Sequence, residues 1–123
     1  MLANTFSLAD KTVLVTGASS GLGAHFARLA QAAGARVVLA ARRVERLQVL
    51  AEALQANGGE ALAIALDVTR RDSVEQAFDQ AEARFGVVDV IINNAGIGDP
   101  GRFLDMRAVS YTHLRAHETV LDL

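Results

Sequence analysis

The sequence alternates short, continuous apolar runs with longer stretches in which apolar residues recur at helical spacing. Four runs are predicted to be strands: Thr12–Thr16, Arg36–Ala40, Ala61–Leu66 and Val88–Asn93. The stretches between them predict three helices, over Gly21–Ala33, Val44–Ala56 and Arg71–Phe85. Continuous apolar strands are typical of parallel sheets covered on both faces. Because strands and helices alternate, the sequence predicts an α/β fold with a right-handed, doubly wound sheet.

Each predicted helix has one apolar face that we expect to pack on the sheet. In the first helix this face consists of Leu22, Phe26, Leu29, Ala30 and Ala33. In the second helix it consists of Leu47, Leu50, Ala51 and Leu54. In the third helix it consists of Val74, Ala77, Phe78, Ala81 and Phe85. Glycines follow the first two helices, as is usual at helix ends.

Composition limits the classes of function. With 51% hydrophobic and 21% charged residues in 123, the chain is typical of one globular domain. A net charge of -2 and the lack of a basic cluster give no indication of nucleic-acid binding. The absence of cysteine excludes disulfides, thiolate catalysis and cysteine-ligated zinc, and we expect no metal site. No signal peptide or membrane-spanning run is present, so we expect no membrane partner and a cytoplasmic location.

A glycine-rich loop, Thr16–Gly23, joins the first strand to the first helix. Gly17 allows a tight turn, Gly21 lets backbone approach a pyrophosphate, and Gly23 lets the helix pack close to the strand. The helix N-terminus offers unpaired N–H groups to an anion, and Ser19 and Ser20 can add hydroxyl donors. A glycine-rich turn without a ligand is the alternative, but the order of strand, loop and helix favours dinucleotide binding.

The chain resembles the classical short-chain dehydrogenase/reductase family in three motifs. These are T-G-x-x-x-G-x-G at residues 16–23, the pair Asp67-Val68 after the third strand, and Asn93-Asn94-Ala95-Gly96 after the fourth. The resemblance covers roughly residues 8–106. It implies a Rossmann-type sheet of about four strands in the order 3-2-1-4. It also implies hydride transfer between NAD(P) and an alcohol or carbonyl substrate, usually in a homo-oligomer.

The residues after the second strand indicate which dinucleotide is bound. NAD-preferring sites have an acidic residue there for the ribose hydroxyls, but this chain has Ala41. Arg42 and Arg43 follow, and a guanidinium can pair with a 2′-phosphate or stack on adenine. We therefore predict NADP over NAD, with Arg42 as the main contact. The alternative is that both arginines are solvated charges near the next helix.

The resemblance implies further cofactor contacts. The loop residues Gly17, Ser19, Ser20, Gly21, Leu22 and Gly23 would hold the pyrophosphate. Asp67 would accept from the adenine amino group, although it could instead cap the following helix. Val68 would pack near the adenine. Asn94, Ala95 and Gly96 would line the ribose and nicotinamide side, Asn93 would tie the sheet together, and His25 is interpreted as an ordinary helix residue.

The family's catalytic serine and Tyr-x-x-x-Lys pair are not predicted in this chain. Lys11 is the only lysine, and 27 residues lie beyond Gly96. Tyr111 and Arg115 have the right spacing, but they come too early and arginine does not replace lysine. We therefore assign no catalytic residue. The chain alone should at most bind nucleotide.

The last residues have a different character. The segment 109–118, VSYTHLRAHE, matches a translated transposase sequencing adapter. We therefore expect residues 1–107 to form part of an NAD(P)-binding domain and residues 108–123 to be a non-native tail. The fourth strand would then have a bare edge, the chain would be poorly soluble, and the oligomer interface would be missing. The alternative function is a non-catalytic nucleotide-binding or sensor protein on the same fold.

Overall fold

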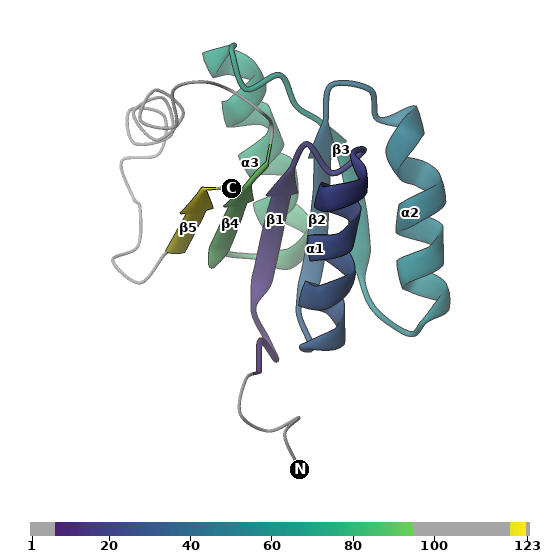
Figure 1. The fold of residues 1–123 in the computed structure, drawn as a ribbon. Helices are drawn as coiled ribbons and strands as arrows, with labels where there is room; N and C mark the ends of the chain where they lie inside the picture. Colours follow the sequence, from purple (N-terminus) through teal and green to yellow (C-terminus); the bar gives the residue numbers. More distant parts are fainter. Residues whose placement is uncertain (1–6, 95–118, 123) are drawn as a thin grey trace.

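The computed structural model describes residues 7–94 and 119–122, the latter as backbone only (Figure 1). The elements follow one another as β1 (Thr12–Thr16), α1 (Gly21–Ala32), β2 (Arg36–Ala41), α2 (Glu45–Ala56), β3 (Ala61–Ala65), α3 (Arg71–Phe85), β4 (Val90–Asn93) and β5 (Thr119–Asp122). In the described part of the chain, no helix has the length and apolar character needed to span a membrane.

The strands form one parallel sheet in the order β3-β2-β1-β4-β5. The predicted order 3-2-1-4 is therefore confirmed for the first four strands. The expectation that β4 has a bare edge is wrong in this structure, because β5 pairs along it from Val90↔Thr119 to Asn93↔Asp122. The fifth strand comes from the segment expected to be a tail without a place in the sheet.

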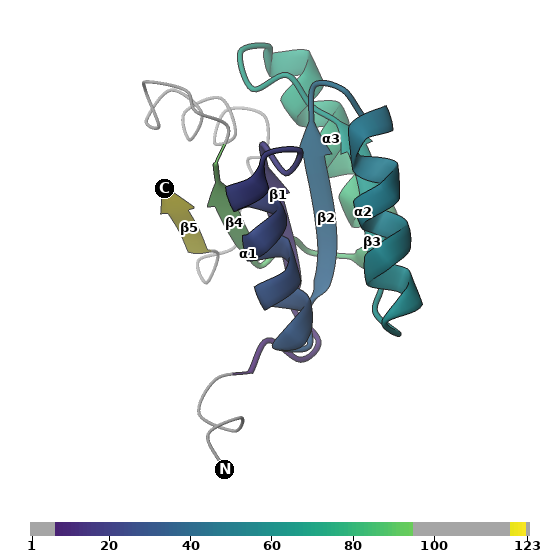
Figure 2. The ribbon, with the colours of Figure 1, turned by 45° about the vertical axis from the view of Figure 1, so that its right-hand side comes forward.

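Helices cover both faces of the sheet, so its strands are apolar on both sides (Figures 1 and 2). On one face, α1 and α2 pack over alternate strand residues such as Val13, Val15 and Leu39. On the other face, α3 packs Phe78 over Leu14 and Ile64. All five residues of β1 are buried, which places the end of this central strand deep between the layers.

The helix boundaries differ little from the predicted ones, but the buried face of α1 was predicted only in part: Ala30 is buried and Phe26 packs partly buried against the core, as expected. Gly23, Ala27 and Ala30 are its buried residues, whereas Leu22 and Leu29 are 53% and 52% exposed. Small residues face the sheet because they let the helix axis approach it closely, and the larger leucines then lie on the flank. The predicted faces of α2 and α3 are confirmed, with Phe85 only partly buried.

Candidate functional site

A hollow of about 540 Å³ lies where β1, β2 and β3 end. Its lining combines backbone and hydroxyl groups with three guanidinium groups and four apolar side chains. The residues are Thr16, Gly17, Ser19, Ala40, Ala41, Arg42, Arg43, Arg46, Leu66 and Val68. Because the carboxyl ends of parallel strands meet at one edge of the sheet, residues far apart in sequence surround this single space.

The glycine loop turns into α1 in the way its sequence predicts. Gly17 has a φ of 64°, a backbone conformation that favours glycine. A side chain at position 23 would strike the carbonyl oxygen of Gly17, whereas one at position 21 would meet open space. Gly23 is therefore required for packing, and Gly21 leaves the backbone open to approach from outside.

The start of α1 leaves donors free beside this loop. Ser20 is the N-cap, and its hydroxyl accepts from the Gly23 amide at 3.0 Å. The amides of Gly21 and Leu22 have no acceptor among the described residues. Unpaired amides and the positive end of the helix dipole together favour an anion at this position.

The segment between β2 and α2, together with the first turn of α2, adds positive charge to the lining of the hollow. Arg42, Arg43 and Arg46 are all exposed there, and none forms an ion pair within residues 7–94. The helix begins after Val44, which provides no side-chain cap. Arg46 was missed by the sequence reasoning, although its place in the first turn of the predicted helix, shortly after Arg42 and Arg43, could have indicated it.

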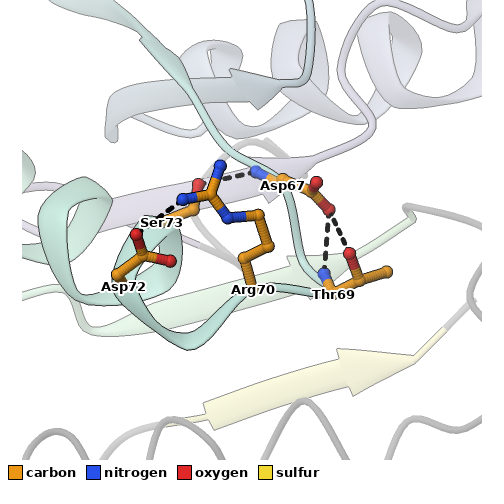
Figure 3. Close-up of polar contacts among 5 residues, drawn as sticks. All are labelled: Asp67, Thr69, Arg70, Asp72 and Ser73. Atoms are coloured by element: carbon orange, nitrogen blue, oxygen red, sulfur yellow. Dashed lines mark hydrogen bonds and ion pairs between the residues drawn. The ribbon is translucent and has the colours of Figure 1, made fainter.

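Asp67 lies in the turn between β3 and α3 (Figure 3). Its carboxylate accepts from the amide of Thr69 at 3.0 Å and from the hydroxyl of Thr69 at 2.6 Å. These bonds lower the pKa of Asp67 below its usual range, and the charges of Arg42 and Arg70 lower it further. The alternative that Asp67 caps α3 is wrong, because the N-cap residue is Arg70.

A second polar connection joins β1 to β4 behind the loop. The hydroxyl of Thr16 donates to Asn93 Oδ1 at 3.0 Å and accepts from the amide of Asn94 at 2.9 Å. Asn93 is buried, so the prediction that it ties the sheet together is confirmed. His25 is exposed on α1, where its ring lies edge-on to Phe26, in keeping with an ordinary helix position.

The structure brings some of the predicted cofactor residues together and leaves others apart. Gly17, Ser19, Arg42, Arg43 and Val68 line the hollow. Ser20, Gly21, Leu22 and Gly23 continue the loop into α1. Asp67 stands between the lining residues Leu66 and Val68, and Asn94 bonds Thr16 and Ser20, but neither is a lining residue. Ala95 and Gly96 lie outside the described residues.

Comparison with known proteins identifies the family. Residues 11–115 match the short chain dehydrogenase family, and the chain therefore belongs to it. A relative from Azotobacter vinelandii, an L-rhamnose 1-dehydrogenase (NAD(P)(+)), is 45% identical over 103 residues, which cover 80% of this chain and 40% of the relative. An uncharacterized oxidoreductase of Listeria monocytogenes is 44% identical over 91 residues, covering 74% of this chain and 37% of the relative.

A solved structure shows the same arrangement of elements. A putative D-mannonate oxidoreductase from Haemophilus influenza, crystallised with bound NAD, superposes with a TM-score of 0.73 at 27% identity. The match covers 81% of this chain and 36% of that one. The chain thus spans about two fifths of the length of the relatives named here.

Proposed function

We propose that this chain is the nucleotide-binding part of an NADP(H)-dependent oxidoreductase that interconverts an alcohol and a carbonyl compound. The observation that carries the proposal is the composition of one hollow. Its lining combines residues of the glycine loop with Arg42, Arg43 and Arg46. NADP carries phosphate groups in two separate places, the pyrophosphate and the 2′ position of the adenosine ribose.

The loop fits a pyrophosphate. Gly21 has no neighbour within 4 Å of the position a side chain would take, so backbone can approach the phosphate oxygens. The free amides of Gly21 and Leu22 would donate to them, and Ser19 has an exposed hydroxyl beside them. When bound, the nicotinamide would supply or accept the hydride, while the residues of this chain hold and orient the nucleotide.

The arginine side of the hollow fits a 2′-phosphate better than a free ribose. Ala41 has no acceptor for ribose hydroxyls, whereas the three guanidinium groups supply forked donors for a phosphate. Leu66 and Val68 provide an apolar wall for the adenine. Asp67 remains ionised through its contacts with Thr69, and we propose that it accepts from the adenine amino group.

The names of the relatives support nucleotide binding but do not choose between the two cofactors. The Azotobacter relative is named for both NAD and NADP, and the Haemophilus structure holds NAD. The choice of NADP therefore depends on Ala41 and the three arginines of this chain.

The chemical step, transfer of the hydride and of the substrate proton, is proposed for the whole protein and not for this chain alone. Asn94, Ala95 and Gly96 would lie on the nicotinamide side. The family's tyrosine–lysine pair, which would move the substrate proton, is not matched by Tyr111 and Arg115, as argued above. We therefore propose that this chain binds nucleotide without turnover. We also propose that the whole protein acts on a small alcohol or carbonyl substrate as a homo-oligomer.

Equilibrium titration of NADPH and NADH into the chain tests the proposal. We expect both to bind and NADPH to bind more tightly, since only NADPH presents a phosphate to the arginines. Equal affinity would contradict the choice of NADP. Failure of both to bind would contradict nucleotide binding itself.

A further inference from the structure

The strand β3 forms one outer edge of the sheet, so one row of its backbone groups faces away from β2. The Glu60 carbonyl oxygen and the Leu66 amide both bond to β2, at the two ends of the β2–β3 ladder. Because the backbone groups of successive strand residues point in alternate directions, those of residues 61, 63, 65 and 67 face outward. Such a row of backbone groups can pair with a strand of another chain.

The first of these outward groups is covered from α2. Gln55, near the end of that helix, donates its Nε2 to the Ala61 carbonyl oxygen at 2.9 Å. The side chain thus reaches back over the turn between α2 and β3 to the edge of the sheet. A neighbouring strand that used this carbonyl oxygen would first have to displace the glutamine.

The last of the outward groups is covered from α3. The amide of Asp67 donates to Ser73 Oγ, in the first turn of that helix, at 2.8 Å (Figure 3). In the described part of the chain, the outward groups of Ala63 and Ala65, which lie between the two covered ends, have no partner. The free part of the edge is therefore reduced to these two residues.

The strand itself has none of the usual protection of an edge. Its sequence, ALAIA, contains no charged residue and no proline. Ala65 is exposed and Ala63 is half-buried, so small side chains leave the backbone between the covered ends accessible. Two copies of this strand could pair about a twofold axis, since each would offer the same uncharged edge to the other.

We propose that Gln55 and Ser73 are edge guards, side chains that keep β3 from pairing with β3 of a second copy of this chain. They occupy the outward groups at the two ends of the strand, so a second copy finds few hydrogen-bonding groups between them. This role concerns association of the chain and is separate from nucleotide binding. If the two bonds only stabilised the turns beside β3, their loss would not change association between folded chains.

The first test removes the donor of Gln55 while keeping a long, unbranched side chain with good helix propensity. Sedimentation velocity over a concentration series should show that Gln55→Met self-associates at about tenfold lower concentration than the unaltered chain. The reason is that a guarding bond no longer has to be broken in each of two copies. Gln48→Met adds the same apolar group at another exposed position of α2 and should behave as the unaltered chain does. Equal association of the two variants would overturn the proposal.

The second guard and a charge at the edge test where the chains meet. Gln55→Met combined with Ser73→Ala should associate at a lower concentration than Gln55→Met alone, because both ends of the edge are then free. Adding Ala65→Lys to this double variant should restore the monomer, since lysines of the two copies would repel each other beside the paired strands. Association that persists with Ala65→Lys would place the contact elsewhere and overturn the proposal.

Amide hydrogen exchange locates the contact directly. The outward amides of Ala63 and Ala65 should exchange quickly in the unaltered chain and slowly in the associated double variant. Exchange in the buried strand β1 should stay slow in every variant, as expected if folded chains associate. Association without protection of Ala63 and Ala65, or with fast exchange in β1, would contradict the role of the two guards.

Discussion

Thr12 and Asp89 are joined by two hydrogen bonds where β1 and β4 begin. The amide of Thr12 donates to the Asp89 carboxylate at 2.9 Å, and the amide of Asp89 donates to the Thr12 carbonyl oxygen at 2.9 Å. The carboxylate thus satisfies a backbone group at the start of a fully buried strand. The sequence shows Asp89 only as the single charged residue in an apolar run, and it does not reveal that this residue bonds Thr12.

Replacing Asp89 with alanine should lower the free energy of unfolding by about 1.5–3 kcal/mol, the usual cost of losing a hydrogen bond to a charged group. Asp89→Asn keeps a side-chain oxygen for Thr12 and should cost roughly half as much. Urea unfolding of the three proteins measures both differences. Equal stability of the alanine variant and the unaltered chain would contradict the role of this bond.

The exposed flank of α1 gives a second stability test. Leu29 is 52% exposed, and we expect Leu29→Ala to change the free energy of unfolding by no more than about 0.5 kcal/mol. Leu54 on α2 is fully buried, and Leu54→Ala should cost about 2–5 kcal/mol because it leaves a cavity. Similar losses for the two variants would show that α1 buries the face predicted from its leucine spacing.

The pKa of Asp67 predicts an acid-sensitive contribution to stability. Its folded pKa is lowered by the bonds from Thr69, so the stabilisation is complete above the unfolded value of about 3.9 and is lost as pH falls through the folded value. Asp67→Asn removes the titrating group. The melting temperatures of the two proteins should therefore differ by a constant amount at neutral pH and converge in acid. A constant difference throughout would contradict this account.

Pairing between β4 and β5 predicts how a shortened chain behaves. A chain ending at residue 118 would expose the backbone groups of β4, an edge rich in β-branched residues. We expect it to aggregate at lower concentration, as measured by light scattering. Nucleotide binding should be unaltered, because the hollow lies at the ends of β1, β2 and β3, and β4 separates β5 from these strands in the sheet. Unchanged scattering would show that β5 does not protect this edge.

The elements and their order were predictable because each depends on a local pattern. The bounds of α3, Arg71–Phe85, are those expected from its single apolar stripe. The helix α1 has two possible packing faces, one of leucines and one of glycine and alanine. Periodicity alone does not say which one faces the sheet. Contact with the sheet decides in favour of the smaller residues.

The site was predictable only in part, for a similar reason. Gly17 and Arg42 follow directly after strands and Val68 lies three residues after β3, so the strand order alone brings them to one edge. The bond between Asn94 and Ser20 joins residues 74 apart, and the distance between them is set by the packing of α1 against the sheet. No pattern in the sequence reports that distance.

The most direct test of the central claim is the effect of Arg42→Ala on the two cofactors. We predict that NADPH binding weakens by about 1.5–3 kcal/mol, since a charge-assisted bond to the 2′-phosphate is lost, while NADH binding is nearly unchanged. Arg28→Ala, an exposed position on α1 away from the hollow, is the matched control and should alter neither affinity. Equal losses for NADPH and NADH in the Arg42→Ala protein, or no loss for either, would contradict an arginine-bound 2′-phosphate in this hollow.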